Sequence, residues 1–219
     1  MKEILSDYDH SHLDKRIAEV EKRTSAQIVL AVIERSDSYA ELPWKAFALG
    51  ASIAGLLIFI IDLTISYWIS HVVMLIAVAA MLSAGAFFAI LTVLVPLFAK
   101  LFLSTYRVET EVRQYAESLF LDKELFATSR RTGILILVSL FEKQIIILPD
   151  KGLTSRLSKD AMREIISKMT MPLKQNDITR AMEIGLEQLS EVLGTSDAGK
   201  SGEASTNELP NNIIEEKGV

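Results

Sequence analysis

Two long apolar runs decide the fold of this chain: AFALGASIAGLLIFIIDLTISYWI at residues 46–69 and VVMLIAVAAMLSAGAFFAILTVLVPLF at residues 72–98. The second run has no charged residue, and the first has only Asp62. A helix of about 20 apolar residues spans the hydrocarbon core of a bilayer, because each residue adds about 1.5 Å. A buried helical pair in a soluble core is the alternative, but neither run has the polar stripe typical of such helices. We predict a transmembrane hairpin.

Small residues suggest how the two helices pack. Ala51 and Gly55 lie four apart in the first run, and Ala80 and Ala84 lie four apart in the second. Small residues at this spacing let two helix backbones approach closely inside a bilayer. We expect the hairpin to pack through these positions.

The positive charges predict the orientation. Basic residues flank both runs on their outer ends, at Arg35, Lys45, Lys100, Arg107 and Arg113, whereas the link between the runs contains none. Cytoplasmic flanks of membrane helices are enriched in Lys and Arg. We therefore expect a multi-pass protein of a bacterial inner membrane with both termini in the cytoplasm.

The soluble part is predicted to be discontinuous. Residues 27–33 (QIVLAVI) are typical of a strand buried on both faces, which needs neighbouring strands. The available neighbours, residues 134–141 and 144–148, come after the membrane runs and form an antiparallel pair. The hairpin, residues 44–100, is thus inserted after the first strand of one domain made of residues 1–43 and 101–194.

Helices and a tail complete the prediction. We expect helices over residues 11–24, 108–123, 158–169 and 177–192, the first capped by Ser11 with Asp14 and the third ended by Pro172. Residues 195–219 have little to bury and are predicted to be disordered.

Composition excludes several functions. The net charge of −5 argues against a nucleic-acid partner. With no cysteine, the chain has no disulfide, thiolate metal site or thiol nucleophile, and three histidines leave little material for a histidine-based site. We expect no cofactor.

Four segments resemble the TPM domain family, a thylakoid-lumen phosphatase-like group. These are residues 21–29 (EKRTSAQIV), 132–139 (TGILILVS), 143–153 (KQIIILPDKGL) and 172–178 (PLKQNDI). The resemblance implies an α/β/α sandwich with a mixed sheet. Many family members have an Asp-Asn pair before the glycine that opens the central strand, linked to cation binding and a proposed acid phosphatase activity. Here Arg131-Thr132 stand before Gly133, so we expect the metal site to be lost.

The candidate binding residues are Arg130, Arg131, Thr132, Gly133 and Asp150. Two arginines followed by a Thr-Gly backbone could hold an anion, such as a phosphate or lipid headgroup, or a partner protein. A solvated basic loop facing the membrane is the alternative interpretation. No nucleophile–base pair or Gly-rich phosphate loop stands out, so we assign no catalytic residue.

Three functions remain open from sequence. The favoured one is a non-catalytic accessory or assembly factor of a membrane complex, with the lipid bilayer as the other partner. The alternative is a metal-dependent phosphatase-like hydrolase of the same fold using Asp150. A proton or ion conduit would rest on Asp62, which could instead reach the interface and pair with His71.

Overall fold

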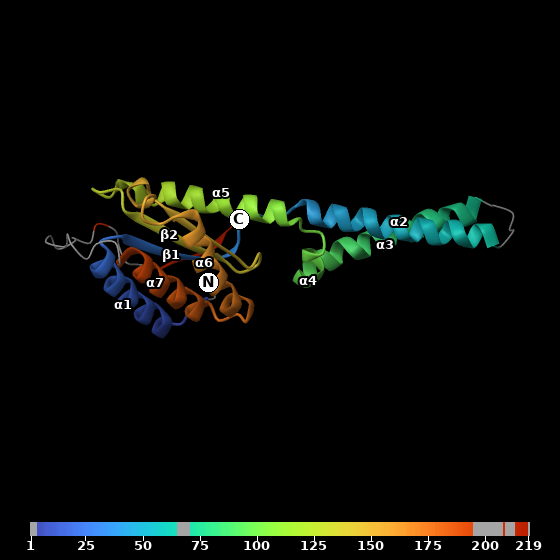
Figure 1. Ribbon diagram of the computed structural model, residues 1–219. Helices are drawn as coiled ribbons and strands as arrows, with labels where there is room; N and C mark the ends of the chain where they lie inside the picture. Colours follow the sequence, from blue (N-terminus) through green and yellow to red (C-terminus); the bar gives the residue numbers. More distant parts are fainter. Residues whose placement is uncertain (1–3, 65–70, 195–207, 209–212, 219) are drawn as a thin grey trace. The chain divides into compact units, whose positions relative to one another are not determined.

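The computed structural model describes residues 4–64, 71–194, 208 and 213–218. The chain divides into two compact units, Met1–Asp37 with Glu109–Val219, and Ser38–Val108. The second unit holds both apolar runs and is wider than the predicted insertion of residues 44–100. Figure 1 shows the ribbon with the labels used below.

A mixed four-stranded sheet forms the centre of the first unit, with the order β3-β2-β1-β4. Its strands are β1 (Gln27–Arg35), β2 (Gly133–Ser139), β3 (Gln144–Pro149) and β4 (Ile214–Gly218). Strand β1 runs parallel to β2 and β4, while β2 and β3 are antiparallel. Residues 27–33 are buried throughout, because β1 has a neighbour on each edge and helices cover its faces. The α/β fold with a mixed sheet is confirmed.

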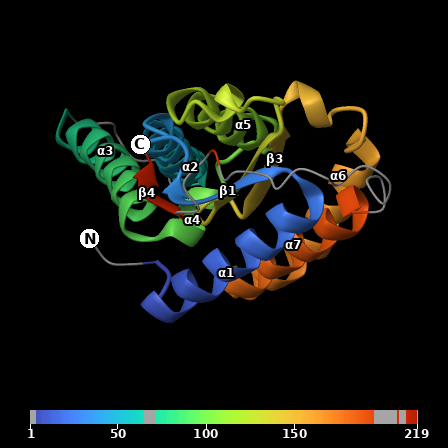
Figure 2. The same ribbon diagram turned by 90° about the vertical axis from the view of Figure 1, so that its left-hand side faces the viewer.

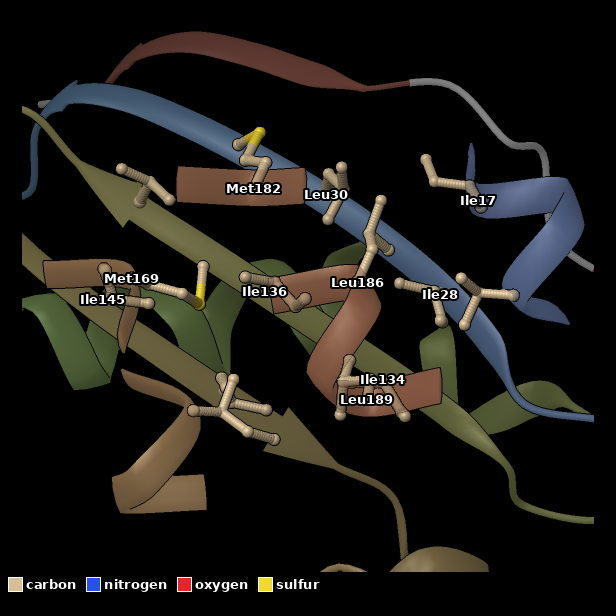
Figure 3. Close-up of a cluster of buried hydrophobic side chains, with 14 of the residues drawn as sticks. Ile17, Ile28, Leu30, Ile134, Ile136, Ile145, Met169, Met182, Leu186 and Leu189 are labelled. Carbon is tan, nitrogen blue, oxygen red and sulfur yellow. The ribbon is translucent and has the colours of Figure 1, made fainter. Parts of the chain in front are cut away.

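Helices cover both faces of this sheet (Figure 2). On one side lie α1 (Asp7–Thr24), α6 (Lys159–Lys174) and α7 (Ile178–Gly194), and on the other lies α5 (Thr105–Asp122). Alternate residues of the strands point to each side. Figure 3 shows the core on the α7 side, where Leu30 and Ile136 meet Leu186.

The prediction of a disordered tail was wrong for residues 214–218, which form β4 beside β1. Adjacent residues of a strand point to opposite faces. Glu215 accepts hydrogen bonds from the Ile4 and Leu5 N–H groups, both at 3.0 Å, and Glu216 accepts one from the Tyr115 hydroxyl at 2.6 Å. Burial and this bond raise the pKa of Tyr115. Backbone pairing with β1 and these hydrogen bonds to Glu215 and Glu216 hold the segment, and Ile213 just before it joins the core.

Two helix boundaries differ from prediction. Helix α1 begins at Asp7, because Ser6 is the N-cap and forms a capping box with Asp9. The predicted cap, Ser11, lies inside the helix; both sites have the Ser-x-x-Asp pattern, and the earlier one is used. Helix α6 continues through Pro172 to Lys174, since the fully buried Leu173 keeps the last turn on the core.

The second unit contains α2 (Glu41–Thr64), α3 (His71–Leu94) and the short α4 (Pro96–Lys100). Both α2 and α3 are long and apolar enough to cross a membrane. A Cβ at Gly50 would lie 2.8 Å from the Ala84 carbonyl oxygen, so the two backbones touch there.

Two of the four predicted packing positions, Gly55 and Ala84, lie at the contact between α2 and α3. Gly55 faces Met81 and Gly85 faces Phe47, whereas Ala80 is exposed. Gly50 and Gly85 are contact positions that the sequence analysis did not name. Small residues at neighbouring positions made the alternatives indistinguishable by spacing alone.

Candidate functional site

The antiparallel pairing of β2 and β3 brings the candidate binding residues together. Ile134 at the start of β2 pairs with Pro149 at the end of β3, so the loop before β2 meets the turn after β3. The short helix η1 (Leu125–Ala127) precedes that loop, and η2 (Lys151–Leu153) follows the turn. Asp150 donates its N–H to the Gly133 carbonyl oxygen at 2.8 Å, and Gly152 donates to that of Arg131 at 2.9 Å.

Two glycines allow this close approach. A Cβ at Gly133 would lie 2.1 Å from the Leu125 carbonyl oxygen. A Cβ at Gly152 would lie 2.4 Å from the carbonyl oxygen of Arg130 and 2.6 Å from that of Arg131. Both distances to backbone are far inside van der Waals contact, so no side chain fits at either position.

Arg131 and Asp150 form a two-pronged ion pair at the centre of the site. The Arg131 Nε donates to one carboxylate oxygen of Asp150 at 2.7 Å, and Nη2 donates to the other at 3.0 Å. The Lys151 N–H also donates to Asp150, at 2.7 Å. Asp150 is only 4% exposed, whereas the Arg131 side chain is 47% exposed. The hydrogen bonds to Asp150 raise the pKa of Arg131.

Arg131 is further held by its backbone and by an aromatic ring. Its φ of 55° is in the left-handed region, and its N–H donates to the Thr128 carbonyl oxygen at 3.0 Å. The guanidinium carbon lies 5.7 Å from the centre of the Phe126 ring. This arrangement directs the guanidinium to Asp150.

The loop N–H groups that an anion would need are already engaged. Thr132 donates its N–H to the Thr128 hydroxyl at 2.9 Å. Ser129 donates both its N–H and its hydroxyl to the Glu208 carboxylate at 2.7 Å. These bonds, with a smaller contribution from Arg130, lower the pKa of Glu208. The Glu208 carboxylate therefore already accepts the two hydrogen bonds that Ser129 could offer to an external anion.

A divalent cation does not fit at Asp150. Both carboxylate oxygens accept hydrogen bonds from the guanidinium, whose positive charge would repel a metal ion. Within residues 4–64, 71–194, 208 and 213–218, no group of three or more His, Cys, Asp or Glu side chains gathers with a geometry suited to a metal.

The other sequence candidates lie elsewhere. Asp62 is exposed on α2 and His71 is the first residue of α3. A pairing of Asp62 with His71, or a conduit through the hairpin, stays a prediction.

The fold and this geometry can be compared with known proteins. The sequence pattern of the TPM domain matches residues 93–192. This part of the chain is similar to a TPM domain. The match includes the candidate loop and the strand pair β2–β3, while α1 and β1 lie before it.

A solved structure similar to the whole chain is the NMR structure of the BA42 protein from the psychrophilic bacterium Bizionia argentinensis. The alignment covers 98% of this chain and 97% of that one, with 16% identity and a TM-score of 0.58. At this identity the likeness concerns the fold alone. No curated protein matches the chain significantly.

Sequence reasoning about the TPM domain missed several residues of this cluster. Thr128 and Ser129 lie in the polar loop that precedes β2, and their capacity to bond backbone groups is a usable signal. Glu208 lies in the segment predicted to be disordered, and nothing in the adjacent sequence marks it as part of a site.

Proposed function

We propose that this protein is anchored in a membrane by α2 and α3, and that its TPM domain acts by binding a partner protein. Its role would be that of an accessory or assembly factor in a membrane complex. The observation that carries this proposal is the ion pair of Arg131 with the buried Asp150.

The ion pair argues against hydrolysis by the candidate loop. Metal-dependent phosphoryl chemistry needs carboxylates that can ligate the ion and polarise the substrate. Asp150, the acid placed at the end of β3, is engaged by Arg131 and by the Lys151 N–H. Converting this arrangement into a metal site would require Arg131 to leave and would uncover a buried carboxylate.

The same loop offers a surface for a partner. Arg130 is exposed and Arg131 keeps almost half of its side chain in contact with solvent. Backbone hydrogen bonds to Thr128 and Gly152 fix the backbone of Arg131. The exposed Arg130, next to the partly exposed Arg131, suits an acidic patch on another protein, since arginine recognises carboxylates with defined geometry.

We place the domain in the cytoplasm, at the inner membrane of a bacterium. The support is the distribution of Lys and Arg around α2 and α3, together with a link that has neither residue.

The test is affinity purification of the tagged full-length protein from its native membranes in mild detergent. We expect a nearly stoichiometric membrane protein to co-purify. Arg130→Glu should release it, because the charge at the proposed contact is reversed. Arg163→Glu is the matched control, since Arg163 is an exposed arginine on α6.

Two outcomes would overturn the proposal. One is a protein that purifies alone, or a partner that both charge reversals release equally. The other is metal-dependent hydrolysis of a phosphate monoester by the purified protein that disappears in Asp150→Asn, which would establish the phosphatase-like alternative.

A further inference from the structure

The chain changes direction sharply between α3 and α4. Val95 has extended backbone angles, φ −121° and ψ 96°, and interrupts the helix. Pro96 then opens α4, where its missing N–H costs nothing because the first helical N–H groups have no partner within the helix. Figure 1 shows the turn between the two helices.

Helix α4 has one packed side and one exposed side. The Phe98 ring packs against Phe88 of α3 at 5.8 Å and against Phe102 at 5.4 Å, edge to face. On the other side, Leu97 is 78% exposed and Leu101 is 76% exposed. Two large aliphatic side chains this exposed on a single helical turn need an apolar surrounding.

The position of α4 along the hairpin indicates what surrounds it. Helix α2 has 24 residues, which is about 36 Å at about 1.5 Å per residue, against a hydrocarbon core of roughly 30 Å. If the core ends near Thr64, its other boundary falls near Lys45 on α2 and near the end of α3. Helix α4 follows that boundary directly.

The residues near this level are those of a membrane interface. Trp44 and Tyr106 are both exposed, and amphipathic aromatic rings favour the headgroup level. Lys45 and Arg107 both reach Glu41, at 3.9 Å and 3.2 Å. Their charges surround the base of the hairpin, where phospholipid phosphates lie.

We propose that α4 lies in the phospholipid headgroup layer, with Leu97 and Leu101 inserted among the upper parts of the acyl chains. This inference rests on the proposed membrane anchoring by α2 and α3. In this arrangement α4 lies parallel to the membrane surface, whereas α2 and α3 cross the membrane. The partner of this surface is a phospholipid bilayer that contains anionic lipid.

The absence of cysteine from the sequence makes the test direct, because each introduced cysteine is labelled alone. The full-length protein would carry a fluorescent NBD group at Leu97→Cys or Leu101→Cys, in vesicles of phosphatidylcholine and phosphatidylglycerol. Leu56→Cys on α2 is the control for the bilayer centre, and Met171→Cys on α6 is the control for solvent. Quenching is measured with lipids that carry a nitroxide near the headgroup or near the chain end.

We expect positions 97 and 101 to lose most of their emission with the shallow nitroxide and much less with the deep one. Position 56 should show the reverse order, and position 171 should keep its emission with both. Quenching at 56 without quenching at 97 and 101 overturns the inference on α4 alone. Emission at 56 that neither nitroxide quenches overturns the membrane anchoring, and the inference on α4 with it.

Discussion

Gly152 controls how closely the turn after β3 approaches the loop before β2. Any side chain there would enter the backbone of Arg130 and Arg131. We expect Gly152→Ala to lower the free energy of unfolding by about 1–3 kcal/mol, because the two loops must separate. Thermal unfolding in detergent measures the change. Gly194→Ala is the control, since nothing lies within 4 Å of a Cβ there; equal losses in both variants would contradict the argument.

The ion pair of Arg131 and Asp150 should behave as one unit. Asp150→Asn leaves the guanidinium opposite a neutral amide in a nearly buried position, and we expect a loss of about 1–3 kcal/mol. Arg131→Gln alone should also destabilise the domain, because it uncovers the buried carboxylate. A double-mutant cycle measures the coupling. Additive losses would show that the two side chains act independently.

The residue types in the sequence identified this loop as a candidate site, but they did not predict the ion pair between Arg131 and Asp150. The arginines before β2 and the acid at the end of β3 were grouped from sequence as one set of candidate binding residues. That Arg131 would engage both oxygens of Asp150 depends on its left-handed backbone, and a non-glycine residue with positive φ has no clear signature in sequence.

At the level of secondary structure, two serines test where α1 begins: Ser6, which is the N-cap, and Ser11, which lies inside the helix. Ser6→Ala removes the N-cap and should cost about 1 kcal/mol. Ser11→Ala changes an exposed residue inside the same helix and should be neutral or slightly stabilising, because alanine favours helices. Thermal unfolding distinguishes them; a larger loss for Ser11→Ala would return the helix start to the position expected from sequence.

The penalty for losing Ser6 should depend on pH. The Ser6 hydroxyl is the main cause that lowers the pKa of Asp9 below its usual value. The stabilisation is therefore complete above the unfolded pKa of about 4 and is lost as the pH falls through the lower folded pKa. The difference in Tm between the wild type and Ser6→Ala should shrink in acid.

Strand β4 depends on Glu215 for its attachment to the start of α1. Glu215→Ala should speed hydrogen exchange at the Ile4 and Leu5 N–H groups, because it removes their acceptor. Lys217→Ala, at an exposed position of the same strand, should leave these rates unchanged. Unchanged exchange in Glu215→Ala would mean that the backbone pairing alone holds β4.

Sequence periodicity predicted the elements that bury apolar residues and missed the one that does not. Strands β1, β2 and β3 are aliphatic runs, and their ends agree with prediction within two residues. The sequence of β4, IEEKG, has one apolar residue. Strand β4 is held in place by residues far away in sequence, and a local sequence pattern cannot reveal such contacts.

For the whole molecule, the charge distribution predicts where the TPM domain lies. A reporter active only in the periplasm and fused after residue 194 should be inactive, and one active only in the cytoplasm should be active. A fusion within residues 65–70 should give the opposite results. A periplasmic signal from the first fusion would reverse the proposed orientation.

The parallel pair β1–β2 has a consequence for the timing of folding. Ribosomes synthesise β1 first, and residues 36–132, about 100 residues, must follow before β2 exists. At about 5–20 residues per second, β1 waits on the order of 5–20 s for its neighbour while α2 and α3 are made. During that interval the seven-residue run QIVLAVI, uncharged and β-branched, is an aggregation hazard on the nascent chain. We therefore expect that β1 is protected during translation by α1, which is made before it, or by a chaperone.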